Sequence, residues 1–185
     1  MIRRWIPIGS PEYITMDASK AYTGDHSPAI KLSATEPRGF SQAGLALLSD
    51  KTYTGRILLA GDPAAKVSVS LIWGTGDTGR QTVIISNLTA AYAKYPLSFK
   101  SPVETTDAKL EITATGSGTV YVGAVSLMPA DNIEGWRSEV IAVLKSLCSG
   151  VYRWPGGNFL SAHDWRDADR KSTRLNSSHG KLYRM

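Results

Sequence analysis

The chain has 185 residues, of which 42% are hydrophobic and 20% charged, as in an ordinary globular protein. No apolar run approaches the about 20 residues of a membrane-spanning helix, and the single cysteine, Cys148, excludes an internal disulfide. The net charge of +5 comes mostly from Asp169–Met185, which has five basic residues and one acid, so the near-neutral body does not predict a nucleic-acid-binding face. Two N-terminal arginines are followed by no apolar segment, so a secretory signal is not predicted, and the sequence indicates no compartment.

The first 128 residues predict an N-terminal extension, residues 1–26, and a β-sandwich over residues 27–128. Apolar residues alternate with polar ones in several short segments, and turn residues such as Gly61-Asp62-Pro63 separate the segments. About eight short strands with this punctuation favour a jelly roll. The expected strands are Ala29–Ser33, Phe40–Leu48, Tyr53–Ala60, Val67–Trp73, Gln81–Ser86, Tyr95–Lys100, Lys109–Ala114 and Thr119–Leu127.

The pattern changes over residues 129–168. Val140, Val143, Leu144 and Leu147 repeat at helical spacing, and a short strand is expected over 151–154. One helix and one strand cannot close a sheet, so this segment predicts the start of a truncated α/β domain.

The segment 151–167 reads VYRWPGGNFLSAHDWRD and has the residues of a ligand-binding loop. Arg153 is a charged residue within an otherwise apolar strand. Gly156 and Gly157 allow a close approach of the backbone, and the amide of Asn158 both donates and accepts hydrogen bonds. The alternative is that Arg153 pairs with a buried acid and that Pro-Gly-Gly is only a turn.

From Ser126 to Asp167, the segments SLMP, RWPGGNF and DWRD, with the helix between them, resemble α-L-arabinofuranosidases of glycoside hydrolase family 51. The preceding sandwich is similar, more weakly, to a carbohydrate-binding-module-like domain that some members insert. The resemblance implies a retaining (β/α)8-barrel hydrolase acting on arabinose-containing polysaccharides or oligosaccharides. We expect neither a cofactor nor a metal. The expected fold is therefore mainly β, a jelly-roll sandwich followed by a helix–strand unit of an incomplete barrel.

The resemblance places Arg153, Gly156, Gly157 and Asn158 in the sugar-binding subsite, with Arg153 near the nucleophile and Asn158 at the sugar hydroxyls. Trp165 borders the pocket or is structural. Retaining glycosidases need two carboxylates about 5 Å apart. None of the glutamates follows an asparagine, as the acid/base of that family does, so no catalytic residue is assigned and the chain is expected to be inactive alone.

Other features carry weaker hypotheses. The glycine-rich segment 74–79 is interpreted as a hairpin turn rather than a phosphate-binding loop, and His26 and His163 lack metal-ligand spacing. Aromatic residues on the expected strands form either a sugar-stacking platform or part of the core: Tyr53, Trp73, Tyr92 and Tyr95.

The segment 169–179, DRKSTRLNSSH, resembles the translation of a sequencing-adapter oligonucleotide, and the alternative is a disordered basic tail. We therefore expect the natural sequence to stop at Ala168. The first barrel strand of the family also has no counterpart ahead of the sandwich, so we expect the natural N-terminal part to be missing. Three functions stay open: an inactive arabinofuranosidase fragment, a non-catalytic carbohydrate-binding sandwich, and a structural module without a ligand.

Overall fold

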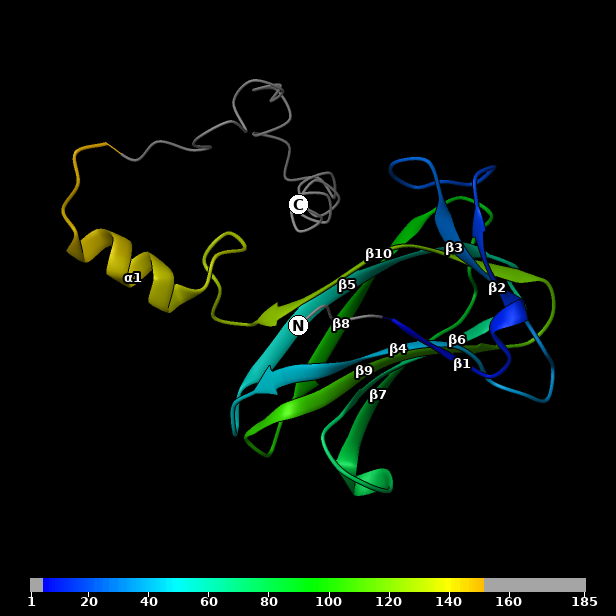
Figure 1. Cartoon of the computed structure of the whole chain (residues 1–185), viewed down its shortest axis with the longest axis horizontal. Coiled ribbons are helices and arrows are strands. Elements are labelled where there is room, and N and C mark those ends of the chain that lie inside the picture. Colours follow the sequence, from blue (N-terminus) through cyan, green and yellow to red (C-terminus); the bar gives the residue numbers. More distant parts are fainter. Residues whose placement is uncertain (1–4, 152–185) are drawn as a thin grey trace. The chain divides into compact units, whose positions relative to one another are not determined.

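A computed structural model describes residues 5–151 of the chain (Figure 1). The chain divides into two compact units, Met1–Ala130 and Asp131–Met185, each of which is described by itself. Residues 5–130 of the first unit contain ten β-strands, and the described part of the second unit contains one α-helix.

The first unit is a sandwich of two five-stranded antiparallel sheets (Figure 1). One sheet, called sheet A here, has the order β1 (Ile6–Ile8), β4 (Arg38–Leu47), β9 (Thr105–Thr115), β6 (Lys66–Ile72) and β7 (Arg80–Ile85). The other, sheet B, has the order β2 (Ile14–Asp17), β3 (Ser27–Lys31), β10 (Thr119–Pro129), β5 (Thr52–Gly61) and β8 (Ala93–Lys100). This architecture confirms the predicted jelly-roll sandwich.

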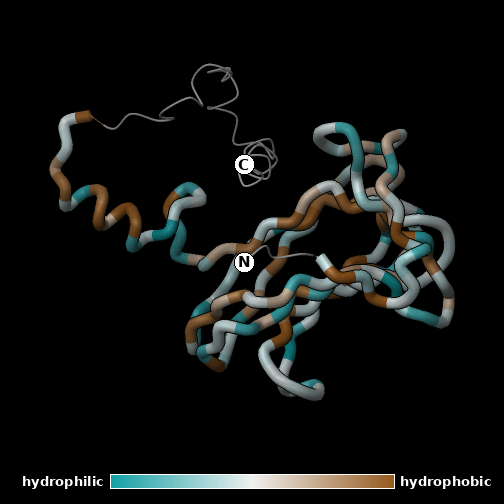
Figure 2. The backbone as a smooth tube through the Cα atoms, in the orientation of Figure 1, coloured by the Kyte–Doolittle hydropathy of each residue, from teal (hydrophilic) through white to brown (hydrophobic). Residues whose placement is uncertain are grey.

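The alternation of apolar and polar residues explains why these segments form half-buried strands. In β8, Leu97 and Phe99 are buried while the residues between and beside them are exposed. In β6, Val67, Val69 and Leu71 are all fully buried. Figure 2 shows apolar residues along the strands of both sheets. Each such large side chain contributes about 1.5–3 kcal/mol by its burial.

All eight predicted strands are present, but the sequence did not reveal β1 and β2. These two short strands come from the segment assigned to an N-terminal extension, and each forms one edge of a sheet. Pro7 lies in β1, opposite Phe40, and a proline is tolerated there because the outer side of an edge strand needs no N–H donor.

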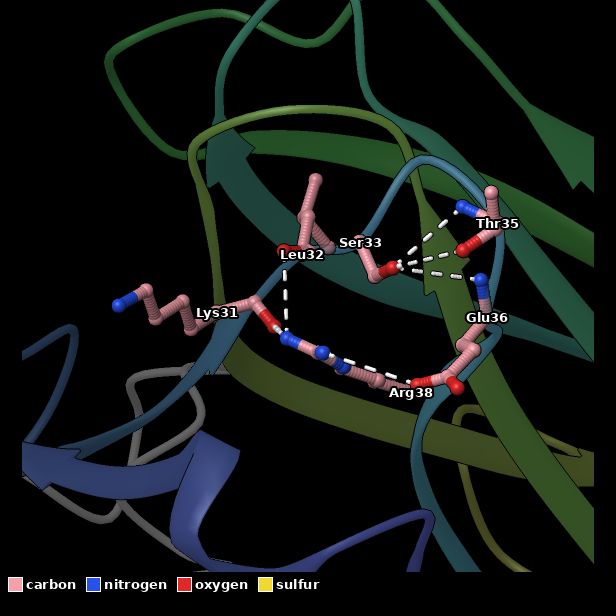
Figure 3. A network of polar contacts seen from close by, with 6 residues as sticks. All are labelled: Lys31, Leu32, Ser33, Thr35, Glu36 and Arg38. Atoms are coloured by element: carbon pink, nitrogen blue, oxygen red, sulfur yellow. Dashed lines mark hydrogen bonds and ion pairs between the residues drawn. The ribbon is translucent and has the colours of Figure 1, made fainter.

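Arg38 closes one end of the sandwich, where the chain crosses from β3 to β4 (Figure 3). Its side chain is only 12% exposed. Nη1 donates hydrogen bonds to the carbonyl oxygens of Lys31 (3.1 Å) and Leu32 (3.3 Å), and Nη2 lies 3.7 Å from the Glu36 carboxylate. The guanidinium also stacks on the Tyr13 ring, 3.4 Å from its centroid. These contacts compensate part of the cost of burying a charge.

The described part of the second unit contains α1 (Ser138–Ser146), within the segment predicted to be helical. Val140 and Val143 of α1, and Leu147 directly after it, are exposed. Before the helix, the Asn132 side-chain oxygen accepts a hydrogen bond of 2.9 Å from the N–H of Gly135. No helix within residues 5–151 is long and apolar enough to cross a membrane. The barrel strand expected over 151–154 lies, except for Val151, outside the described residues, so the barrel stays a prediction.

Candidate functional site

A shallow hollow of about 380 Å³ lies at the end of the sandwich where the β4–β5, β6–β7 and β8–β9 connections meet. Its lining combines one large aromatic side chain with charged and amide groups from both sheets. These residues are Asp50, Trp73, Arg80, Gln81, Lys100 and Pro102. Its volume falls in the range of about 300–1,000 Å³ that is usual for small-molecule sites.

Trp73 lies in the connection of the β6–β7 hairpin, and its side chain lines the hollow. Trp73 directly follows β6, and its backbone N–H donates a hydrogen bond of 2.8 Å to the carbonyl oxygen of Gly79. Gly76 has φ +68°, a conformation that favours glycine, at the start of the 3-10 turn Asp77–Gly79. The interpretation of this segment as a hairpin is confirmed. Part of the indole packs against the core, and part faces the hollow.

One hydrogen bond between the sheets and one exposed ion pair join polar groups around Trp73. The Gln81 side-chain oxygen accepts a hydrogen bond of 2.7 Å from the N–H of Lys100. Lys100 Nζ lies 3.6 Å from the carboxylate of Asp50. The backbone of Asp50 has φ +57° and lies in the turn between β4 and β5. The hollow therefore offers an aromatic surface beside carboxylate, amide, ammonium and guanidinium groups, which together donate and accept hydrogen bonds.

A second aromatic cluster lies over the outer face of sheet B. The rings of Tyr22 and Tyr92 meet edge to face at 5.1 Å, and both pack against Gly123, where a Cβ would lie 2.7 Å from Tyr22 Cγ. Tyr92 Oη donates a hydrogen bond of 2.7 Å to the Lys20 carbonyl oxygen, and burial raises the pKa of the Tyr92 phenol. Lys20 Nζ lies 4.9 Å from the centroid of the Tyr121 ring. The cluster holds the β2–β3 and β7–β8 connections against the sheet.

The four aromatic residues of the expected platform therefore do not lie together. Trp73 precedes β7 and Tyr92 follows it, so they are at opposite ends of that strand. Tyr53 is buried in the core, where its hydroxyl accepts a hydrogen bond from the N–H of Leu48, and Tyr95 packs partly against the core. Of these four aromatic residues, only Trp73 lines the hollow.

The predicted subsite residues Arg153, Gly156, Gly157 and Asn158, together with Trp165, lie outside the described residues. Their role stays a prediction. Within residues 5–151 there is no group of three or more His, Cys, Asp or Glu side chains that could hold a metal ion.

The sequence did not single out the polar residues of the hollow. Arg80, Gln81 and Lys100 lie at strand ends, and Asp50 is in a turn, where polar residues are ordinary. They reach one rim because β7 and β8, the edge strands of two different sheets, lie side by side where the sheets pack, as the hydrogen bond between Gln81 and Lys100 shows. The one signal for the hollow in the sequence was Trp73, a large aromatic residue directly after the alternating strand β6.

Comparison with solved structures defines the class of the sandwich as a jelly roll of the carbohydrate-binding-module type. TmCBM61, solved with β-1,4-galactotriose, matches with a TM-score of 0.50 and 14% identity over 68% of this chain and 88% of that one. The CBM22-1–GH10 modules of Clostridium thermocellum xylanase 10B, solved with xylohexaose, match with a TM-score of 0.50 and 17% identity over 68% and 26%. These identities establish a shared fold only.

Comparison with sequences gives a shorter match. No family model matches the chain. A stretch of 50 residues is 44% identical to an intracellular exo-alpha-L-arabinofuranosidase of Bacteroides ovatus. The match covers 27% of this chain and only 9% of the length of that relative.

Proposed function

We propose that the sandwich is a non-catalytic carbohydrate-binding module and that the hollow around Trp73 is its binding site. The observation that carries the proposal is an aromatic side chain that lines a hollow together with polar groups from both sheets, of which Gln81 is held by a hydrogen bond to the N–H of Lys100. A sugar ring has an apolar face of C–H groups and a rim of hydroxyls. The indole of Trp73 stacks on the apolar face of the sugar, and the side chains of Asp50, Arg80 and Gln81 form hydrogen bonds with its hydroxyls.

The size and openness of this end of the sandwich favour a short stretch of a polysaccharide over a fully enclosed small molecule. Three connections border the hollow, and the side chains of Asp50, Arg80, Gln81 and Lys100 are exposed. The fold supports the proposal because two structures of this type were solved with β-1,4-galactotriose and xylohexaose. The natural ligand is proposed to be a plant polysaccharide or oligosaccharide that contains arabinose.

Calorimetric titration of the whole chain with α-1,5-arabinan, xylohexaose and β-1,4-galactotriose tests this proposal. We expect at least one of these to bind, and Trp73→Ala to weaken binding about tenfold or more, as removal of a central aromatic contact does. Trp73→Phe should retain part of the affinity. Trp5→Ala is the matched control, because Trp5 packs on Phe40 of sheet A and does not line the hollow. Equal affinities of Trp73→Ala and the unsubstituted chain would refute the site.

A second candidate is that the chain is part of an α-L-arabinofuranosidase of glycoside hydrolase family 51. The match to the Bacteroides ovatus enzyme favours it, together with the RWPGGNF segment over residues 153–159. In this proposal Arg153 and Asn158 bind the arabinofuranosyl group within a (β/α)8 barrel.

Hydrolysis of a chromogenic α-L-arabinofuranoside tests the second candidate. We expect no turnover by this chain, because a retaining glycosidase needs two catalytic carboxylates. None of the glutamates of this sequence follows an asparagine, as the acid/base of that family does. Measurable turnover that Arg153→Ala abolishes would show that the catalytic groups are present after all.

A further inference from the structure

The outer face of sheet B has an uneven distribution of charge. Over residues 5–130 the sequence has equal numbers of basic and acidic side chains. The three adjacent strands β10, β5 and β8, however, contain Arg56, Lys94 and Lys100 and no acidic residue. The positive charge there is therefore local and does not reflect the composition of the whole unit.

The register of the strands brings these basic side chains to the same face. Along β8, Leu97 and Phe99 point into the core, so Lys94, Ser98 and Lys100 point outward, as their exposure confirms. Arg56 of β5 lies opposite Pro96 of β8, and Leu58 lies opposite Lys94. Arg56 and Lys94 are therefore diagonal neighbours on the outer face, at a separation of about 7–8 Å.

The basic residues of β8 and β5 form a line that starts at the hollow. Lys100 lines the hollow, and Lys94 lies six residues away along β8, at a distance of about 20 Å. Lys100 is paired with Asp50, whereas none of the ion pairs found among residues 5–151 involves Arg56 or Lys94. We call the outer surface of Arg56, Lys94, Pro96, Ser98 and Lys100 the basic track.

We propose that the basic track binds an acidic polysaccharide, one with uronic acid residues, whose neutral sugars occupy the hollow. This inference rests on the proposed function and names the class of its ligand. The unpaired Arg56 and Lys94, about 7–8 Å apart, and Lys100, about 20 Å further along β8, are exposed cations whose spacing suits carboxylates distributed along a polysaccharide chain. The balanced charge of the unit disfavours a nucleic acid, whose binding domains usually carry a broad basic surplus.

The test compares the binding of the whole chain to polygalacturonate, to neutral α-1,5-arabinan and xylohexaose, and to single-stranded DNA. The variant R56A/K94A removes two charges from the basic track. The control variant K66A/K109A removes the same charge from outward positions of β6 and β9 in sheet A. We expect R56A/K94A to weaken binding of polygalacturonate roughly two- to thirtyfold at low salt and to leave neutral glycans unaffected. The effect should shrink at about 1 M salt.

The outcomes separate this inference from the proposed function. If R56A/K94A binds polygalacturonate as well as the unsubstituted chain does, or if K66A/K109A loses as much, the basic track is refuted while the hollow stands. If single-stranded DNA binds as tightly as polygalacturonate, the surface is a general polyanion site and the glycan assignment is wrong. If Trp73→Ala leaves all glycan binding unchanged, the hollow and the proposed function fail. If the chain binds no glycan, both proposals fail.

Discussion

The side-chain oxygen of Gln81 accepts a hydrogen bond of 2.7 Å from the backbone N–H of Lys100 and so joins the edges of the two sheets at the rim of the hollow. Gln81 is in β7 of sheet A, and Lys100 ends β8 of sheet B. Edge strands of different sheets share no ladder of backbone hydrogen bonds, so this contact fixes their spacing. It therefore links the stability of the sandwich to the geometry of the hollow.

Gln81→Ala should lower both stability and glycan affinity, because it removes this bond. We expect the free energy of unfolding to fall by about 0.5–1.5 kcal/mol, measured by urea denaturation. Gln81→Glu is the matched control, because its carboxylate still accepts a hydrogen bond from the N–H of Lys100. If both variants lose the same stability, the hydrogen bond is not the cause.

Gly55→Ala should be strongly destabilising. A Cβ at Gly55 would lie 2.0 Å from the carbonyl oxygen of Ser126 in the neighbouring strand β10, and backbone atoms cannot move aside without breaking the pairing. We expect a loss of about 1–3 kcal/mol or more, seen as a lower Tm. Gly74→Ala, whose Cβ would meet Gly79 Cα at 3.4 Å, is the control and should cost less. Equal losses would contradict the close approach of β5 and β10.

Tyr92→Phe should change how stability depends on alkaline pH. Burial raises the pKa of the Tyr92 phenol above its ordinary value of 10.0, so the folded state keeps this proton at a pH where the unfolded state has lost it. The resulting contribution to stability is complete below pH 10 and is lost as pH rises through the raised pKa.

Urea denaturation at pH 8 and at several values above pH 10 measures this effect. Tyr92→Phe should show a shallower alkaline decline and, at pH 8, a loss of about 0.5–1.5 kcal/mol for the missing bond to the Lys20 carbonyl. Tyr22→Phe, which keeps the ring contact with Tyr92, should be close to the unsubstituted chain at pH 8. An unchanged alkaline slope for Tyr92→Phe would show that Tyr92 ionises as it does in the unfolded chain.

Arg38→Lys should be destabilising although it keeps the charge. A lysine loses the planar stack on Tyr13. Its single ammonium cannot reproduce the guanidinium geometry in which Nη1 contacts the carbonyl oxygens of Lys31 and Leu32 while Nη2 faces Glu36 (Figure 3). We expect the free energy of unfolding to fall by about 1–3 kcal/mol. The exposed pair Arg137 and Glu139 supplies the control, since Arg137→Lys should change stability by less than about 0.5 kcal/mol. A similar effect at both positions would contradict the special role of Arg38.

The sequence predicted the sandwich well where burial produces a clean period of two. Val67, Val69 and Leu71 in β6 alternate with polar residues and are all fully buried, so the strand is visible from the sequence. β1 escaped prediction because Ile6-Pro7-Ile8 is too short to show a period and Ile6 is 58% exposed. Edge strands are stabilised by pairing with a neighbour, which a local pattern does not report.

The candidate site was harder to predict than the fold. Trp73 and Tyr92 were candidates on chemical grounds alone, and the structure separates them by the length of β7. Asp50 lies in the β4–β5 connection, Gln81 in β7 of sheet A and Lys100 in β8 of sheet B, and they meet only because the two sheets pack against each other. Residues that meet by tertiary pairing leave no local pattern, whereas the RWPGGNF segment was visible as a motif because its residues are contiguous.

The most direct test of the central claim is a map of the ligand contacts by nuclear magnetic resonance during titration with α-1,5-arabinan fragments, xylohexaose and β-1,4-galactotriose. We predict that a bound glycan shifts the indole N–H of Trp73 and the backbone amides of Gln81 and Lys100, and leaves the indole N–H of Trp5 unchanged. Shifts that avoid Trp73, or saturating titrations that shift no resonance of the sandwich, would contradict the account of the hollow as a carbohydrate-binding site.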